Sequence, residues 1–173
     1  MKLFKTMASA VILASCFSSS VFAQAGTEIY QSSLKYHVMF ETLNLQEAIN
    51  NLNYSPNIFV AWKSVSNYGA PTTAPVYRCV IPGSYHGQEH FASRDVRCEG
   101  QINEGIYGYV FTTQMPGTVA LFRAYCHNNE YGKSSHATFD SELRYNQYFS
   151  TCYRKEQTLG YVYPSGNGQV YPR

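Results

Sequence analysis

Three histidines recur at corresponding places of a repeated pattern, and histidine is the side chain best suited to bind zinc or to transfer protons near neutral pH. They are His37, His90 and His136. In three repeats arranged around an axis these imidazoles would converge and could hold a catalytic-type zinc ion with an open fourth position. The alternative is structural: each buried histidine is hydrogen-bonded within its own repeat, with Asp95 or Glu89 as the partner of His90. We favour the structural interpretation.

Two neighbouring carboxylates form the second chemical pattern. Glu99 and Glu104 could act as the paired acids of a glycoside hydrolase. Glu99 also follows Cys98 directly, a place typical of a solvated or turn-bonding residue. The chain contains no G-x-S-x-G, H-E-x-x-H or P-loop motif. The sequence therefore names no catalytic residue, and we expect no cofactor.

Four cysteines follow the N-terminal leader, at positions 79, 98, 126 and 152. An even count in an exported domain predicts disulfides. The repeat pairs Cys79 with Cys98 in one copy and Cys126 with Cys152 in the next. Structural zinc is the weaker alternative because no two of them have C-x-x-C spacing. If all four are in bridges, no free thiol remains as a nucleophile.

Residues 1–23 have the features of a signal peptide: Lys2 and Lys5, an apolar stretch, and a small-residue cleavage site that ends at Ala23. Residues 13–16 also resemble a bacterial lipobox, which would place a lipid on Cys16. We therefore predict a secreted or periplasmic protein or, as the alternative, a lipoprotein anchored in the bacterial envelope. Only lipidation at Cys16 would make the membrane a partner.

Charge excludes one class of partner. The chain has 13 Lys and Arg residues against 11 Asp and Glu residues, and removal of Lys2 and Lys5 with the leader leaves eleven of each sign. A neutral domain without a basic run is not expected to bind nucleic acid.

The elements that must position these residues repeat along the chain. Residues 24–33 are small and polar and predict a mobile lead-in. Residues 24–173 then form one repeat domain, whose three units are residues 75–115, residues 118–166, and residues 168–173 together with 34–63. Each unit predicts strand, strand, helix or loop, strand; in the last unit, apolar positions 45, 48, 49 and 52 predict a short helix. The predicted fold is mainly β with one or more short helices, closed by pairing of the C-terminal strand with the N-terminal unit, and trefoil-like or propeller-like.

The motifs of the first complete copy resemble a widespread secreted repeat family of unknown function, with the pattern Y-R-C, D-H-F-x-S, C-E-G and E-G-x-x-G-Y. The matching stretches are 76–79, 89–93, 98–100 and 104–110. The chain departs from the family at two positions. The Asp before the histidine is Glu89 in the first copy and Ser135 in the second, and the Phe after the histidine is Ala137 in the second copy. The resemblance implies a β-rich repeat domain with an attachment role, and it supplies no catalytic residue.

Aromatic residues are the remaining signal, with 16 tyrosines and one tryptophan in the chain. Loop tyrosines offer an apolar face and a polar tip to sugars and proteins. The candidate ligand-binding residues are Tyr85, His86, His90, Trp62, Tyr107 and Tyr131, of which Tyr85, Tyr107 and Tyr131 are expected in loops or turns. The first hypothesis is an exported, non-enzymatic binding module for carbohydrate or for an extracytoplasmic surface protein. The alternatives are a small extracellular hydrolase or metal enzyme that uses the repeated histidines, and an inhibitor or toxin accessory subunit.

Overall fold

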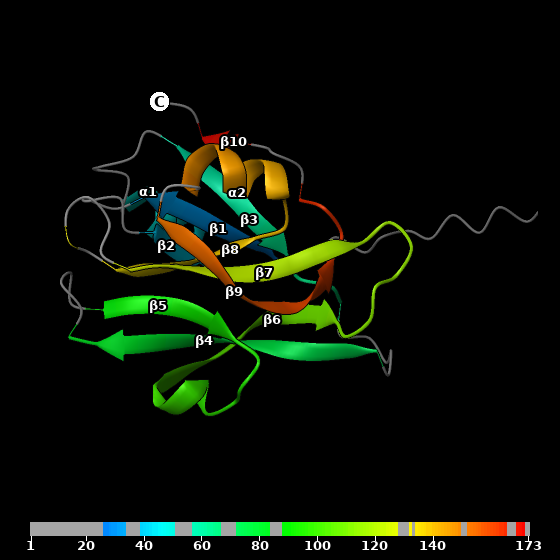
Figure 1. Ribbon diagram of the computed structural model, residues 1–173, viewed down its shortest axis with the longest axis horizontal. Coiled ribbons are helices and arrows are strands. Elements are labelled where there is room, and N and C mark those ends of the chain that lie inside the picture. Colours follow the sequence, from blue (N-terminus) through cyan, green and yellow to red (C-terminus); the bar gives the residue numbers. More distant parts are fainter. Residues whose placement is uncertain are drawn as a thin grey trace, which may run out of the picture.

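The computed structural model describes residues 26–33, 39–50, 57–66, 72–83, 88–127, 132, 134–149, 152–165 and 169–171. These residues form a mainly β protein with two antiparallel sheets and two short α-helices (Figure 1). The elements are β1 (Glu28–Ser33), β2 (Met39–Thr42), α1 (Leu45–Asn50), β3 (Ile58–Lys63), β4 (Thr73–Pro82), β5 (Gln88–Ser93), the 3-10 turn η2 (Cys98–Gly100), β6 (Ile102–Phe111), β7 (Val119–Cys126), β8 (Ser135–Phe139), α2 (Glu142–Phe149), β9 (Tyr153–Val162) and β10 (Gln169–Tyr171).

Strands from the N-terminal and C-terminal parts of the described chain lie in one sheet. Its strand order is β10-β3-β1-β2, and Gln169 of β10 lies opposite Phe59 of β3. This confirms the predicted pairing of the C-terminal strand with the N-terminal unit. The expectation that residues 168–173 supply the first strand of that unit is wrong, because β1 takes this position and β10 lies at the edge of the sheet. The other sheet has six strands in the order β5-β4-β6-β9-β7-β8.

Three stretches of chain share one topology, in which the first strand lies between the second and the third. β1 lies between β2 and β3, β4 between β5 and β6, and β7 between β8 and β9. The expectation of a mobile lead-in at 24–33 is therefore wrong for residues 28–33, which form β1. The sequence did not predict this strand because Gln31 and Ser32 are polar. Both are nevertheless only 1% exposed. Gln31 is buried at little cost because its side chain donates to Glu41 and to the Thr138 carbonyl.

Each first strand bends at the same point. A register shift against the third strand follows Ile29 in β1, Val76 in β4 and Leu121 in β7. All three side chains are fully buried in one hydrophobic cluster. The bulges therefore turn one equivalent residue of every unit into a shared core.

The residues opposite these three positions differ in size. Trp62 lies opposite Ile29, whereas Gly108 and Gly160 lie opposite Val76 and Leu121. A Cβ on Gly108 would lie 2.8 Å from Cη2 of the buried Trp62 ring. One large side chain and two glycines therefore fill the space that three equal residues would overfill.

Both predicted disulfides are present. Cys79–Cys98 ties β4 to η2, and Cys126–Cys152 ties the end of β7 to the residue before β9, with Cα–Cα distances of 5.5 and 5.0 Å. The predicted helix is present as α1, where the Asn44 side chain caps the amide of Gln46 at 2.9 Å. No helix within the described ranges is long and apolar enough to cross a bilayer.

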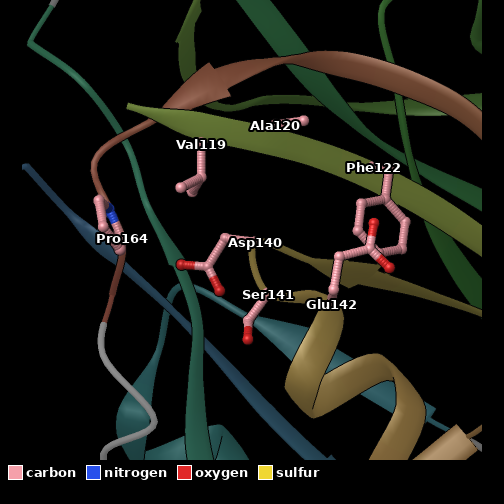
Figure 2. A pocket seen from close by; sticks show the side chains of 7 residues that line it. All are labelled: Val119, Ala120, Phe122, Asp140, Ser141, Glu142 and Pro164. Atoms are coloured by element: carbon pink, nitrogen blue, oxygen red, sulfur yellow. The ribbon is translucent and has the colours of Figure 1, made fainter. Parts of the chain in front are cut away.

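A hollow of about 390 Å³ lies between the start of α2 and the first residues of β7 (Figure 2). Its lining includes Asp140, Ser141 and Glu142 beside Val119, Phe122 and Pro164.

Candidate functional site

Two charged clusters occupy equivalent places at the junctions between consecutive units. In each, the first strand supplies an arginine, the second a histidine, the third a glutamate, and the helix or turn of the preceding unit a further glutamate. Cluster I consists of Glu47, Arg78, His90 and Glu104. Cluster II consists of Glu89, Glu99, Arg123, His136 and Glu156.

Cluster II is tightly hydrogen-bonded around Arg123, which is 5% exposed. Its Nε donates to Glu156 at 2.7 Å, and its two terminal nitrogens donate to Glu99 at 2.8 and 3.1 Å. It also donates to the Ala92 carbonyl at 3.0 Å. The guanidinium therefore has partners on three elements, including a bidentate carboxylate, which is the strongest geometry available to it.

His136 links the two edge strands of the six-stranded sheet through its side chain. Its Nδ1 lies 2.6 Å from Glu89 on β5, and its Nε2 lies 3.5 Å from Glu156 on β9. The ring stacks on Tyr125 with centroids 4.5 Å apart and contacts the Phe91 ring at 5.2 Å. β5 and β8 are thus joined by side chains.

Cluster I has the same residue types in a looser arrangement. Arg78 Nε lies 3.3 Å from Glu104 but has no hydrogen-bond partner within the described part of the chain. The contact from Arg78 to Glu47 is 3.8 Å, and His90 Nε2 lies 3.2 Å from Glu104. Burial, together with the charge of Arg78, lowers the pKa of His90 below its ordinary value.

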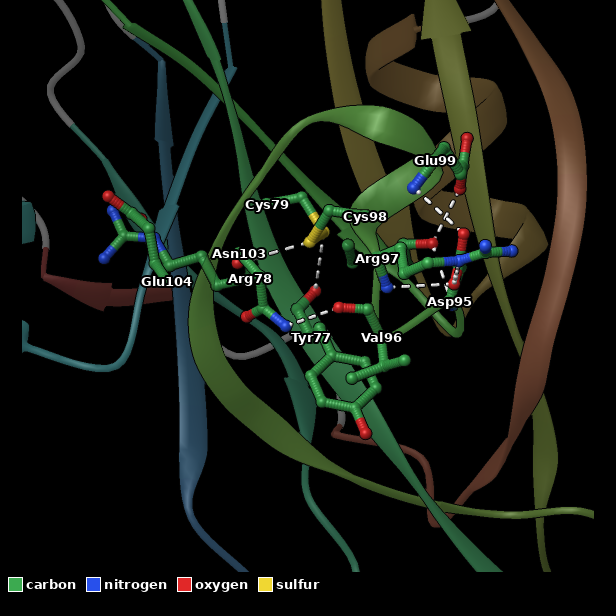
Figure 3. Close-up of a disulfide and its surroundings, with 12 residues drawn as sticks. Tyr77, Arg78, Cys79, Asp95, Val96, Arg97, Cys98, Glu99, Asn103 and Glu104 are labelled. Atoms are coloured by element: carbon green, nitrogen blue, oxygen red, sulfur yellow. Dashed lines mark hydrogen bonds and ion pairs between the residues drawn. A yellow bond between two sulfur atoms is a disulfide. The ribbon is translucent and has the colours of Figure 1, made fainter.

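A repeated capping pattern positions the glutamates of the preceding units. Asp95 accepts from the amides of Arg97 and Glu99 (Figure 3). Ser93 donates to Glu99 at 2.6 Å. In the first unit the Asn44 side chain accepts from the Glu47 amide, and Thr42 donates to the Glu47 carboxylate.

Glu99 has a further local constraint, because it has a φ of +56° beside Cys98 at +51°. The Cys79–Cys98 bridge holds this turn against β4. Hydrogen bonds from Arg123 lower the pKa of Glu99.

The third junction uses the same positions with different residues. Gln31 replaces the arginine and donates to the Thr138 carbonyl at 3.3 Å, as Arg123 donates to that of Ala92. Arg144 of α2 replaces the glutamate and donates to the carbonyls of Val60 and Ala61.

A buried carboxylate completes the third junction. Glu41 accepts from the Thr138 amide at 2.6 Å and from Gln31 at 2.7 Å. Burial raises its pKa.

The partners of the histidines differ from those expected. His90 pairs with Glu104, whereas Asp95 caps a turn and Glu89 pairs with His136 of the next unit. A hydrogen-bonded role within the protein is thus observed for His90 and His136.

The zinc hypothesis required His37, which lies outside the described residues. The register places Phe40 opposite Ser32 and Phe91 opposite the equivalent Cys79, which makes Met39 the counterpart of His90. In the described part of the chain, no group of three His, Cys, Asp or Glu residues could hold a metal ion. The three-histidine site stays a prediction.

The paired-carboxylate arrangement is not formed. Glu99 contacts Arg123 in cluster II, whereas Glu104 contacts Arg78 and His90 in cluster I. Each carboxylate is already an ion-pair partner. We therefore interpret both as structural residues.

The aromatic candidates divide into buried residues and residues outside the described ranges. Trp62 is fully buried and Tyr107 is 3% exposed, and their rings meet edge to face with centroids 6.0 Å apart. The expectation that Tyr107 lies in a loop is wrong, because it lies in β6 where the bulge turns it into the core. Tyr85, His86 and Tyr131 lie outside the described residues.

Sequence reasoning missed one surface feature. Val96, Ile102 and Ile106 are 57%, 53% and 50% exposed, and we call these three residues the β6 patch. Ile106 lies opposite Tyr77 of β4, and the Asn103 side chain donates to the Val96 carbonyl at 2.7 Å, which ties the loop to the strand. Sequence periodicity does not locate these side chains, because β-bulges interrupt the alternation. Ile102 lies opposite Val80 and Ile106 opposite Tyr77, three residues apart on β4, so the two isoleucines take opposite faces of β6.

Comparison with protein-family models, curated proteins and solved structures returned no match.

Proposed function

We propose that this protein is an exported, non-enzymatic module that binds another protein through the β6 patch. The observation that carries the proposal is the exposure of Val96, Ile102 and Ile106 beside a disulfide-fixed turn. Large aliphatic side chains exposed on a cross-linked support are available for contact with a protein partner.

A protein partner is supported over a glycan by the state of the aromatic side chains. Sugar rings stack on exposed aromatic faces. Among the residues whose burial the structure describes, every aromatic side chain is buried or half-buried, and the exposed large apolar side chains are those of Leu, Val, Ile and Met.

A non-enzymatic role is supported by the two clusters. Their histidines, arginines and carboxylates contact one another. These residues recur in both clusters because they stabilise the junctions between consecutive units. An interaction that already holds the ground state together gives no preferential stabilisation of a transition state.

Export is supported by the two disulfides, since such bridges persist in oxidising compartments. We propose further that the three units close into one trefoil-like or propeller-like body. The support is that His136 bridges the two edge strands while β10 pairs with β3. A closed body would present the β6 patch on a rigid frame.

The test is an affinity capture from the extracytoplasmic proteins of the source cells, with identification of the bound proteins by mass spectrometry. The double variant Ile102→Lys, Ile106→Lys should weaken binding of the captured partner at least about tenfold, as loss of central apolar contacts does. The matched control is Leu143→Lys on α2, because Leu143 is 54% exposed and lies outside the patch. Equal binding by both variants, or binding only to glycans on an array, would contradict the proposal.

A further inference from the structure

The hollow beside α2 contains a buried carboxylate that accepts a single hydrogen bond within the described part of the chain. Asp140 is 5% exposed and lies in the middle of the lining residues (Figure 2). Its Oδ2 accepts one hydrogen bond, from the Ser165 amide at 2.7 Å. In the described part of the chain it has no further hydrogen bond and no cation within 4 Å. A carboxylate can accept about four hydrogen bonds, so most of its capacity is unused.

The equivalent position in the preceding unit carries the opposite charge. Arg94 follows the last paired residue of β5 just as Asp140 follows β8, and each precedes a capping residue. The Arg94 guanidinium donates to the Leu159 carbonyl at 2.7 Å. That unit therefore contains its own cation at this position.

In the unit that carries Asp140, the equivalent carbonyl has a different donor. Arg144 of α2 donates to the Ala61 carbonyl at 2.9 Å, and the bulges of β3 and β9 make Ala61 the counterpart of Leu159. Because Arg144 already donates to this carbonyl, position 140 does not need a long side chain that donates to it, as Arg94 does in the preceding unit. An acidic residue stands there instead, beside a space of about 390 Å³.

We infer that this hollow binds an organic cation, an alkylammonium or alkylguanidinium group, with Asp140 as its counter-ion. Val119, Phe122 and Pro164 provide an apolar wall for the alkyl part, and the Ser141 hydroxyl provides a further acceptor. The inference rests on residues outside the β6 patch and does not depend on the proposed protein partner.

The electrostatics of the surroundings fit a cation. The start of α2 carries a positive partial charge, but Glu142 lies in its first turn and offsets it. Lys155 pairs with Glu142 and lies over the Phe122 ring, 4.4 Å from its centroid. Asp140 is thus the acidic group of the hollow that has no cationic partner among the described residues.

The test is an NMR titration of the whole protein with butylammonium chloride, with 1-butanol as the neutral probe of similar shape. Saturable shifts at Val119 and Ser141 are expected from the ammonium, with butanol at least about tenfold weaker because a charged hydrogen bond to Asp140 is missing. Absence of saturable shifts, or equal affinity for the two probes, would overturn the inference. This comparison needs no variant.

Two variants sharpen the assignment. Asp140→Asn keeps an oxygen that can accept the Ser165 amide but removes the charge, and it should weaken butylammonium binding at least about tenfold. Glu142→Gln is the matched control and should change the affinity by no more than about twofold, because Glu142 is exposed and paired with Lys155. Unchanged affinity in Asp140→Asn, with its unfolding temperature unaltered, would overturn the role of Asp140.

A second titration separates the two sources of such a cation. A short peptide with one lysine is compared with the same peptide carrying norleucine. If the lysine peptide binds and the norleucine peptide does not, the cation can be a side chain of a partner protein. If butylammonium binds and neither peptide does, the cation is a free small amine. Equal binding of both peptides would overturn the inference.

Discussion

Clusters I and II contain the same residue types at equivalent positions but differ in geometry. Arg123 is almost fully buried and hydrogen-bonds two carboxylates, whereas the Arg78 side chain is 20% exposed and lies 3.3 and 3.8 Å from its two. The difference follows from what holds the preceding glutamate. Glu99 lies in a turn fixed by a disulfide, and Glu47 lies on a six-residue helix that contains no cysteine. A repeated motif therefore contributes to stability in proportion to how firmly the preceding unit positions its acid.

Removal of the Cys79–Cys98 bridge should have the largest effect on this difference. The Cys79→Ser, Cys98→Ser variant should lose about 3 kcal/mol of unfolding free energy by the chain-entropy argument, measured by urea denaturation. It should also reduce the coupling energy between Arg123 and Glu99, measured by a double-mutant cycle.

The Cys126→Ser, Cys152→Ser variant is the control for this prediction. It should lose a similar free energy, since its loop is of similar length, and should leave the coupling between Arg123 and Glu99 unchanged. Unchanged coupling after loss of the Cys79–Cys98 bridge would mean that the turn holds Glu99 without its disulfide.

The second largest difference is expected between the stability losses caused by replacing Arg123 and Arg78. Arg123→Met should lower the unfolding free energy by roughly 2 to 3 kcal/mol, because charge-assisted hydrogen bonds to partly buried carboxylates are lost. Arg78→Met should cost below about 1 kcal/mol, because its ion pairs are longer and more exposed. Both values come from the same urea titrations, and the same replacement serves as the internal control. Equal losses would show that the two junctions are energetically alike.

Much of the fold was accessible to sequence reasoning because it depends on local pattern. The four cysteines and the apolar positions of α1 identify their elements directly, and the repeat correctly paired the bridges. The meeting of β10 with β3 followed from the same repeat. A feature that depends on residues of one unit can be predicted from the sequence of that unit, even when its contacts with neighbouring units are unknown.

The rest could not be predicted because it depends on contacts between units. β1 reads as polar, and only the Thr138 carbonyl and Glu41 make a buried Gln31 acceptable. Tyr107 turns inward because of a bulge that no sequence rule locates. The partner of Glu89 is His136, 47 residues away in the next unit.

Acid should weaken cluster II through Glu99. Since Arg123 holds the pKa of Glu99 below its ordinary value of 4.5, the folded protein binds this proton less readily than the unfolded chain. The stabilisation is complete above about pH 4.5 and is lost as the pH falls through the lowered value.

This acid dependence is measured as the unfolding temperature between pH 6 and pH 3. The slope should be shallower in Glu99→Gln than in the wild type. Glu47→Gln is the matched control and should leave the slope closer to that of the wild type, because Glu47 lies 3.8 Å from its arginine. A steeper slope in Glu99→Gln would contradict the assignment.

The smallest expected effect concerns His90 in cluster I. Because burial lowers its pKa below 6.5, the unfolded chain takes up this proton first, and the folded state loses stability as the pH falls below about 6.5. His90→Gln removes that titration and can still donate to Glu104, so it should cost below about 1 kcal/mol at pH 7 and less at pH 5.5. The exposed His127 provides the control, as His127→Gln removes a histidine without touching the cluster. If His90→Gln lost more stability at pH 5.5 than at pH 7, the His90–Glu104 contact would be a charged pair, and cluster I would resemble cluster II more closely than its distances indicate.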